Sequence, residues 1–498
     1  MGATLSRRNF LAGCGMALCA AGLRAEQPAD RPNLVVVFPD QMRAQAMGFM
    51  GADRVRTPRL DAFAAEARAF TQAVSNYPVC SPFRAILLSG ALPWVSGVTG
   101  NCVSTERRRG PELRADLTCW SDVLAQAGYD LCYIGKWHLD APHRPWVPTA
   151  NNRGTQKWNE WCPPARRHGF NRWHAYGTYD NHLRPMYWDT DADRDGFRYV
   201  DAWGPEHEAD RAVAFLREAK GPFALVVSMN PPHTGYALVP DRYKRRYAGL
   251  DPTTLATGDY PPAGTPMGDH FRENIGLYLA AVEGVDEQFG RILDALEETG
   301  HAKDTVVLFC SDHGCCLGAH GLAAKNNPFE ESMRIPCLIR WPGRIAPGRD
   351  PGLVDAFDLA PTLLGLLGRP IPAHMVGRDL APYLLGRAPA DLTEPRLYLH
   401  LAGGAVADAF PTLPVPLAPD APTRGVPSGK RGLRGAATKA VFVYDAKAHA
   451  LGAALWDLAA DPHETRNLAA ERPDLLAAQR ATLKSRLAAI GDPFATLL

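Results

Sequence analysis

The sequence has almost no excess charge of either sign. Against 54 Lys and Arg residues stand 53 Asp and Glu residues, so the formal net charge of the 498-residue chain is +1. Proteins that bind nucleic acid through its phosphates carry a clear basic excess. We therefore expect no nucleic-acid partner, although this balance does not exclude a local basic patch.

Two further features are missing. A membrane-spanning helix needs about 20 mostly apolar residues, and no such run follows the N-terminal region, so we expect no stable membrane insertion. The 11 cysteines show no repeated Cys-x-x-Cys spacing, so the usual sequence pattern of a structural zinc site is absent. An exported protein can form disulfides, and the sequence leaves their pairing open.

The N-terminus carries an export pattern. A twin-arginine pair, Arg7-Arg8, stands in the run Ser6 to Leu11, and an apolar stretch from Leu11 to Leu23 follows it. That stretch has the length of a signal peptide and is too short to span a membrane. We predict a signal at residues 1–25, transport of the folded protein by the twin-arginine machinery, and a periplasmic or secreted location. The alternative is a cytosolic N-terminus with a chance arginine pair.

Apolar side chains make up 46% of the sequence, which is enough for a packed core. Short apolar runs predict buried strands that alternate with helices; Leu34–Phe38 is the first of them. This alternation predicts an α/β fold, a mostly parallel sheet sandwiched between helices. The other strands are expected at 131–134, 223–228 and 306–310, and the helices at 58–67, 80–90, 117–127, 206–219, 271–299 and 358–367.

The C-terminal part has a different pattern. Residues 401–432 are rich in Pro, Ala and Gly and predict a long loop. Short strands at Val441–Tyr444 and Ala454–Leu458, with a helix at Pro473–Ala489, predict a small α+β subdomain. We therefore expect an α/β domain at 26–400 and a C-terminal subdomain at 433–498.

Two pairs of polar residues directly follow buried strands. Asp40-Gln41 comes after the strand at 34–38, and Asp312-His313 comes after the strand at 306–310. In an open parallel sheet, ligands bind outside the carboxyl ends of the strands. Two Asp carboxylates and a Gln carbonyl suit calcium, whereas the His would equally suit zinc or manganese. Each pair alone could instead be a helix N-cap or a turn.

A cysteine stands at the start of a predicted helix, next to an arginine, in Cys80-Ser81-Pro82-Phe83-Arg84. A helix N-terminus and an arginine both favour an anion and lower the pKa of a thiol. The alternative is a buried cysteine beside a capping serine.

This segment, with the Ala-Ile-Leu-Leu-Ser-Gly that follows it, resembles the signature of the type I sulfatases of the alkaline phosphatase superfamily. In that family the cysteine is oxidised to formylglycine before folding, and the hydrated aldehyde supplies the nucleophile. The resemblance extends along nearly the whole mature chain. Further matching motifs are Gly135-Lys136-Trp137-His138-Leu139, Pro232-His233-Thr234, Ser311-Asp312-His313-Gly314 with Lys325, and Trp456-Asp457-Leu458.

The resemblance assigns roles to these positions. Arg84 would stabilise the aldehyde hydrate, Lys136 and His138 would contact the nucleophile and sulfate, and His233 and Lys325 would bind sulfate and assist the leaving group. One calcium ion would be held by Asp40, Gln41, Asp312 and His313 together with residue 80. Maturation would require a formylglycine-generating or sulfatase-maturating enzyme as a partner.

The sequence departs from the family pattern at a few positions. Many members have Asp in place of Gln41 and Asn in place of His313; both substitutions keep a donor atom. Phe83 stands where the extended signature usually has Ser, which bears on how efficiently Cys80 is modified. Trp94 to Ser96 replaces a basic, His-containing stretch.

The resemblance implies hydrolysis of a sulfate monoester, of a sulfated carbohydrate or an aryl sulfate. Cations would neutralise the sulfate oxygens, and a general acid would protonate the leaving alcohol. One rival is a phosphodiesterase or phosphonate monoester hydrolase of the same superfamily, and another is an inactive glycan-binding relative.

Residues 158–203 are rich in Trp and Tyr. These rings could stack on sugars or aryl groups, or they could pack onto the sheet. His174, His182 and His320 are further candidates for the pocket.

Overall fold

The computed structural model describes residues 31–401, 412–418, 421 and 426–498, so the predicted signal at 1–25 lies outside the described residues. The expected α/β fold is confirmed. A ten-stranded sheet has the order β12-β2-β11-β10-β1-β9-β4-β6-β7-β8. Its strands are β1 Asn33–Pro39, β2 Arg68–Phe70, β4 Asp130–Lys136, β6 Arg172–Tyr176, β7 Met186–Asp189, β8 Arg198–Tyr199, β9 Phe223–Met229, β10 Thr305–Cys310, β11 Cys337–Arg340 and β12 Gly348–Asp350.

The centre of this sheet is parallel and its flanks are mixed. β10, β1, β9, β4 and β6 run parallel to one another, whereas β11 pairs antiparallel with β10 and β7 pairs antiparallel with β6. The apolar runs predicted the central strands because these strands are buried on both faces. The short flanking strands lack such runs.

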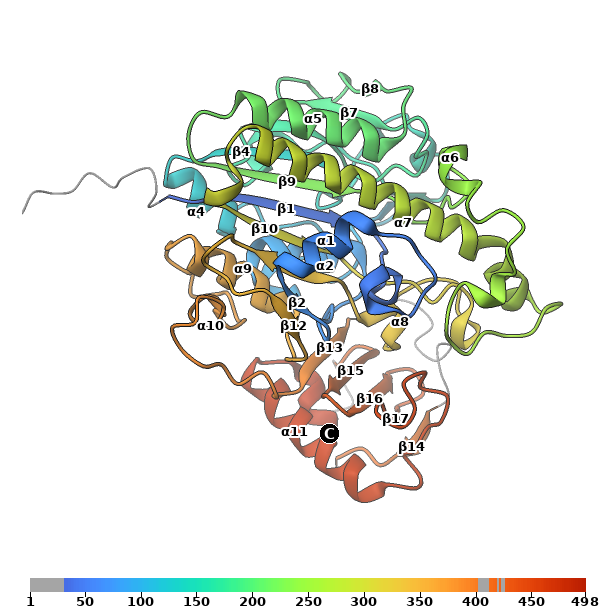
Figure 1. Ribbon diagram of the computed structural model, residues 1–498. Helices are drawn as coiled ribbons and strands as arrows, with labels where there is room; N and C mark the ends of the chain where they lie inside the picture. Colours follow the sequence, from blue (N-terminus) through green and yellow to red (C-terminus); the bar gives the residue numbers. More distant parts are fainter. Residues whose placement is uncertain (1–30, 402–411, 419–420, 422–425) are drawn as a thin grey trace, which may run out of the picture.

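Two layers of helices sandwich the sheet, and Figure 1 shows α5 and α7 lying over one face. Alternate residues of β1 point to opposite layers: Leu34 and Val36 pack in one core cluster, and Val35 and Val37 pack in the other. The helices over the first face are α2 Cys80–Ser89, α4 Trp120–Gln126 and α9 Ala356–Leu366, and those over the second are α1 Pro58–Glu66, α5 Gly204–Glu218 and α7 Pro266–Glu298.

The expected C-terminal subdomain is also confirmed, as a five-stranded antiparallel sheet with helix α11 Pro473–Ala489 (Figure 1, red). The sheet begins before the boundary expected at residue 400. One of its strands lies in the segment expected to be a loop, and a second strand begins in that segment. The strands are β13 Arg396–His400, β14 Leu413–Val415, β15 Gly429–Arg434, β16 Thr438–Asp445 and β17 Ala450–Asp457.

β15 escaped prediction because its sequence, GKRGLR, is charged and glycine-rich although the strand is buried. Ion pairs compensate its charges. Arg434 pairs with Glu330 of the large domain at 2.8 Å, and Arg431 pairs with Asp492 at 2.5 Å. Pairing of this kind is what makes a buried guanidinium tolerable.

A buried ion-pair network links the two parts of the chain. The ammonium group of Lys439 lies 2.8 Å from Glu330 and 2.8 Å from Glu464, and the Lys439 side chain is 0% exposed. Glu330 starts the short helix α8 Glu330–Met333 of the large domain. The subdomain is therefore fastened to the large domain by charges that water does not reach.

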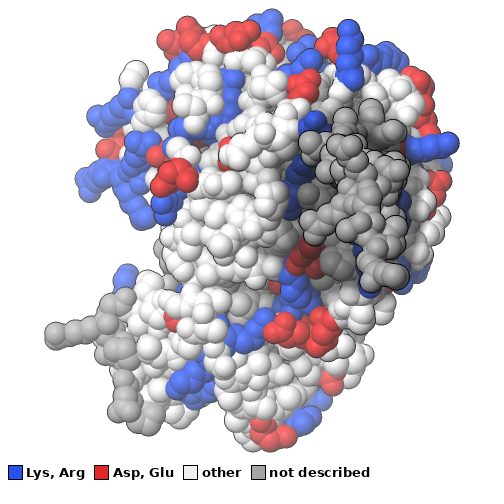
Figure 2. All heavy atoms as spheres, turned by 90° about the vertical axis from the view of Figure 1, so that its left-hand side faces the viewer, with Lys and Arg blue, Asp and Glu red and all other residues white. Residues whose placement is uncertain are grey.

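Within the described residues, no helix is long and apolar enough to cross a membrane. On the face in Figure 2, Lys and Arg side chains are interspersed with Asp and Glu, and Lys and Arg predominate at its upper left margin. This distribution matches the net charge of +1.

Replacing Lys439 by Met should lower the free energy of unfolding by about 3 kcal/mol, the low end for a broken buried ion pair. Burial already raises the pKa of Glu464 to about 7, so this carboxyl would be left buried without its cation, whereas Glu330 would keep Arg434 as a partner. Urea unfolding followed by tryptophan fluorescence measures the shift. Arg472, in an exposed pair with Asp474, gives the control: Arg472→Met should leave the midpoint unchanged. Equal shifts for the two variants would contradict this account of the network.

Candidate active site

The four central parallel strands end at one edge of the sheet and carry polar side chains there. Asp40 follows β1, Asn230 follows β9, Lys136 is the last residue of β4, and Asp312 lies just after β10. The backbone N–H of Asp40 donates to the carbonyl of Met229 at 2.8 Å, so the ends of β1 and β9 are in register. The edge predicted from the strand ends therefore gathers these groups.

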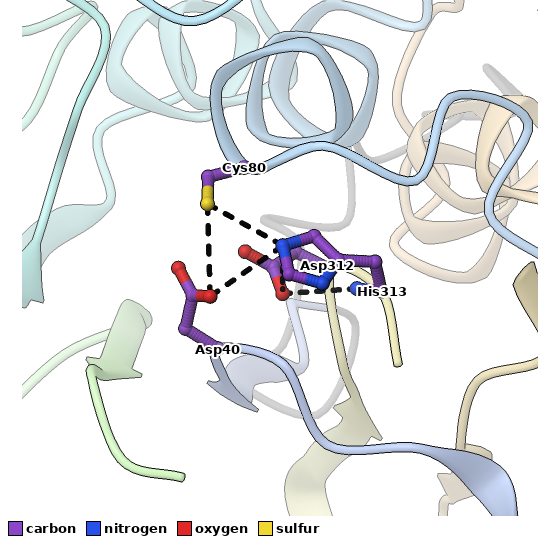
Figure 3. A group of neighbouring side chains, drawn as sticks. All are labelled: Asp40, Cys80, Asp312 and His313. Atoms are coloured by element: carbon purple, nitrogen blue, oxygen red, sulfur yellow. Dashed lines mark hydrogen bonds and ion pairs between the residues drawn. The ribbon is translucent and has the colours of Figure 1, made fainter. Parts of the chain in front are cut away.

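Cys80 faces this edge from the first turn of α2. Asp40, Cys80, Asp312 and His313 each offer a donor atom, and these four atoms lie within 4.8 Å of one another (Figure 3). The Cys80 Sγ lies 3.3 Å from His313 Nε2 and 3.7 Å from Asp40 Oδ1. All four residues are buried.

The tautomer of His313 follows from its contacts. Its Nδ1 lies 2.9 Å from the carbonyl of Gly314 and must donate to it. Burial lowers the pKa of His313 to about 4, so the ring is neutral and its Nε2 carries a lone pair. That lone pair faces Asp40 Oδ1 and Asp312 Oδ1, each at 3.5 Å. Three acceptors turned toward one point repel one another unless a cation lies between them.

The two carboxylates also influence each other's ionisation. Burial, and then the charge of Asp40, raises the pKa of Asp312 to about 7. Burial opposes ionisation of Asp40 as well, but Lys136, followed by His233 and Lys325, holds the pKa of Asp40 well below its usual range. A divalent cation would relieve this repulsion, so the donor set fits a metal ion.

Arg84 bridges the two carboxylates. Its Nη2 donates to Asp40 at 2.9 Å and to Asp312 at 3.3 Å. Its Nη1 donates to the carbonyl of Lys136 and to Ser228 Oγ, both at 2.6 Å. The side chain is 1% exposed, so the guanidinium is fixed between α2 and four strand ends.

Lys136 and Lys325 bring two further positive charges. The Nζ of Lys136 lies 2.8 Å from Asp40 Oδ2 and 3.0 Å from Asn230 Oδ1. The Nζ of Lys325 donates to the Gln41 side-chain carbonyl at 2.8 Å. The carbonyl predicted as a metal ligand therefore accepts a hydrogen bond from Lys325, while the Gln41 backbone N–H donates to Asp312 at 2.9 Å.

His138 lies beside this group with unused hydrogen-bonding capacity. The residue is 2% exposed, and neither ring nitrogen has a hydrogen-bond partner among the described residues. Burial, followed by Lys136 and Arg84, lowers its pKa well below the usual value. Its backbone carbonyl accepts from Ser81 Oγ at 2.7 Å, which ties it to the start of α2. A neutral, unpartnered imidazole at this point is available to a bound substrate.

His233 follows β9 and pairs with an acidic residue that the sequence did not indicate. Its Nδ1 lies 3.2 Å from Asp180 Oδ1. Asn230, which contacts Lys136, also donates to Asp180 at 3.2 Å. Asp180 lies in a loop without strand or motif signals. Asn230 had one signal, its position directly after a predicted strand.

The three further histidine candidates have different surroundings. His182 lies close to the site, because its Nε2 is 3.0 Å from the carbonyl of Thr234. His174 instead contacts Asp189 at 2.6 Å and His207 at 2.9 Å. His320 pairs with Glu331 at 3.1 Å and stacks on Phe329.

Most rings of the aromatic segment pack in the core; Tyr176, Tyr179, Tyr187 and Trp188 share one cluster. Trp158 is the exception that matters for the site. It is partly exposed, and its ring centroid lies 6.2 Å from that of His138. One aromatic face is therefore available next to the group.

Comparison with known proteins gives a consistent match. The profile of the sulfatase family matches residues 32–369. An endo-4-O-sulfatase of Bacteroides thetaiotaomicron is 36% identical over 512 aligned positions, which cover 96% of this chain and 96% of that protein. A ulvan-active sulfatase of Formosa agariphila is 30% identical over 93% of this chain and 82% of its own length.

Solved structures agree with these relatives. A Bacteroides fragilis protein proposed to be a sulfatase superposes with a TM-score of 0.86 at 46% identity, covering 96% of this chain and 99% of its own. The phosphonate monoester hydrolase of Agrobacterium radiobacter superposes with a TM-score of 0.69 at 22% identity, covering 92% of this chain and 96% of its own. The second match shows a shared fold alone.

The thiol of unmodified Cys80 should ionise well below the usual value of 9.0. Burial and Asp40 oppose ionisation, but Lys325, Lys136 and a hydrogen bond from His233 outweigh them and lower the pKa to about 7. Thiolate absorbance of metal-free protein, followed against pH and corrected with Cys80→Ser, measures this pKa. Lys325→Met should raise it, because a positive charge is removed, whereas Lys303→Met, on the exposed turn before β10, should not. A thiol that titrates near pH 9 in the unsubstituted chain would contradict the geometry.

Proposed function

Because this chain belongs to the type I sulfatases of the alkaline phosphatase superfamily, we propose that Cys80 is its nucleophile position and becomes formylglycine. The chain is a sulfuric ester hydrolase. The proposal is supported mainly by one observation: the Cys80 side chain contacts a carboxylate–imidazole cluster while Lys136 and Lys325 lower its pKa.

The charges around residue 80 suit a sulfate ester. Its oxygens carry negative charge that shifts onto the leaving oxygen during hydrolysis, so fixed cations lower the barrier. Lys136 and Lys325 are placed to bind these oxygens. Lys136 ends β4, and Lys325 reaches the same edge from the segment after β10; hydrogen bonds to Asn230 and Gln41 hold their ammonium groups. His138 offers ring nitrogens that have no partner in the described part of the chain.

His233 is placed to act as the general acid. Its Nδ1 faces Asp180, which would hold the ring in place. Nε2 would then deliver the proton to the leaving alcohol. Arg84 orients the site by bridging Asp40 and Asp312, and it would stabilise charge at residue 80.

The residues present fit both groups that the family implies. Asp40, Asp312 and His313, with Gln41 and residue 80, would hold one divalent cation, and its chemistry would be to polarise a sulfate oxygen as a Lewis acid. We propose calcium, because two carboxylates and an amide carbonyl are oxygen donors. Formylglycine at residue 80 would supply, as its hydrate, a hydroxyl nucleophile and a second hydroxyl that allows sulfate to leave.

The substrate we propose is the sulfate ester of a glycan. The relatives named as an endo-4-O-sulfatase and a ulvan-active sulfatase support a carbohydrate. Trp158, beside His138, offers a face for a sugar ring. Aryl sulfates remain useful test substrates. The phosphonate monoester hydrolase shares only the fold at 22% identity, so phosphodiester cleavage is the second candidate.

Maturation and location are part of the proposal. Cys80 is 2% exposed in the folded chain, so a modifying enzyme must act before folding. The twin-arginine pathway carries folded cargo, which places modification in the cytoplasm and the mature enzyme in the periplasm or outside the cell.

Cys80→Ala should lower sulfatase activity at least about a thousandfold, because the nucleophile is removed while the fold is kept. Protein made together with a formylglycine-generating enzyme should carry an aldehyde at residue 80, visible by peptide mass analysis. Cys337→Ala removes another buried thiol, on β11, and should remain active. Full activity in Cys80→Ala would refute the proposed nucleophile.

Chelation should abolish turnover, and calcium should restore it better than manganese or zinc. Asp312→Asn should lose bound metal, counted by elemental analysis, together with activity. If zinc alone restores turnover, the His313 ligand determines the metal preference and the calcium assignment is wrong.

Changing Arg7 and Arg8 to Lys should trap the protein in the cytoplasm in an active form, because modification precedes export. Activity and aldehyde content in the cytoplasmic and periplasmic fractions test both parts. Trapped protein with a free thiol at Cys80 would show that modification follows export, and normal export of the variant would show that the signal was misassigned.

A further inference from the structure

A strongly basic surface borders the active site. We call it the rim and define it as residues 104–112 and 143–158, which include the paired strands β3 Ser104–Thr105 and β5 Gln156–Lys157. The rim contains five arginines and one lysine against two glutamates, Glu106 and Glu112. This excess stands out in a chain whose net charge is +1.

The rim is continuous with the residues around Cys80. The side chain of Asn101 accepts a hydrogen bond from the backbone N–H of Ser81 at 3.1 Å, and the N–H of Cys102 donates to Ser81 Oγ, also at 3.1 Å. From the other segment, Trp158 lies against His138. The residues just before β3 and just after β5 therefore join the rim to the site.

Several rim cations are free to bind anions. Arg107, Arg108 and Arg153 are exposed and have no ion-pair partner within the described ranges. Arg144 forms an ion pair with Glu106, and Arg109 forms one with Glu112. Lys157, by contrast, is buried and holds the loop by donating to the carbonyls of Asn152 and Gly154 at 3.0 and 2.8 Å.

Aromatic rings lie among these cations. Trp146 is partly exposed, with Arg144 at 5.9 Å and Lys157 at 5.5 Å from its ring centroid. Trp158 is partly exposed at the boundary with the site. Aromatic faces bind the apolar faces of sugar rings, and arginine forks bind carboxylate and sulfate groups.

We propose that the rim binds anionic groups of a polysaccharide on sugar units next to the one whose sulfate is cleaved. The enzyme is then selective for charged chains over single sulfated sugars and aryl sulfates. This inference rests on the proposed function of the site. A glycan suits the rim better than a nucleic acid, because the rim adjoins the proposed sulfate-ester site and Trp158 lies at their boundary, beside His138.

The test removes the two free neighbouring charges with Arg107→Ser/Arg108→Ser. Wild-type enzyme is first screened on chondroitin sulfate, ulvan and heparin, and the polymer hydrolysed fastest is the probe, beside its sulfated disaccharide and p-nitrophenyl sulfate. At low salt, kcat/KM for the polymer should fall about tenfold, because electrostatic attraction raises the association rate. The value for the aryl sulfate should not change, and the value for the disaccharide, which has a single neighbouring sugar unit, should fall less than the value for the polymer.

The control variant is Lys303→Ser/Arg344→Ser. It removes two exposed cations, one just before β10 and one after β11, at the edge of the sheet opposite to the site. It should leave kcat/KM unchanged for all three substrates. Raising the salt concentration should slow wild-type turnover of the polymer and reduce the difference between wild type and the rim variant.

Equal losses on polymer and aryl sulfate would overturn the inference, since the arginines would then support the site itself. Unchanged polymer turnover in the rim variant would also overturn it. If, in addition, the wild type bound duplex DNA and the rim variant did not, the rim would be a nucleic-acid surface. Absence of turnover on every sulfate ester would refute the proposed function, which is a separate result.

Discussion

The proposed active site depends on two buried carboxylates that repel each other. Asp40 and Asp312 follow neighbouring parallel strands whose register brings their side chains to the same point. Burial and this proximity raise the pKa of Asp312 to about 7. Arg84 bridges the pair from α2, with Nη2 at 2.9 and 3.3 Å from the two groups. Positive charge at this point is a requirement of the fold, and the same requirement makes the site attractive to a divalent cation and to a sulfate anion.

The arrangement places each charge on a different structural element. Lys136 ends β4, Cys80 opens α2, Lys325 reaches Gln41 from the segment after β10, and Asn230 after β9 holds Lys136. Because the strands are buried on both faces, these groups have little freedom to rearrange. Charge stabilisation in a preformed site avoids the reorganisation that water would need during the reaction. In the proposed mechanism, the rigid sheet is thus what would allow attack on a weakly electrophilic sulfate ester.

The sequence predicted the parts that depend on local pattern. Apolar runs located β1, β9 and β10, and the polar pairs after them located Asp40 and Asp312 at one edge. It could not predict partners fixed by tertiary contact: Asp180 lies in a loop without a pattern and becomes relevant only because His233 and Asn230 reach it. The charged strand β15 was missed for a related reason, since its burial depends on Glu330 and Asp492, which are distant in sequence.

The most direct test of the account is the fate of oxygen from water. Hydrolysis of a sulfated glycan in water labelled with heavy oxygen, followed by mass analysis of both products, shows which bond is cleaved. The proposed site around residue 80 would direct attack onto sulfur, because its cations would bind the sulfate oxygens and its acid would protonate the alcohol. The account therefore predicts label in the released sulfate and none in the sugar hydroxyl. Label in the sugar hydroxyl would show attack on carbon and would contradict it.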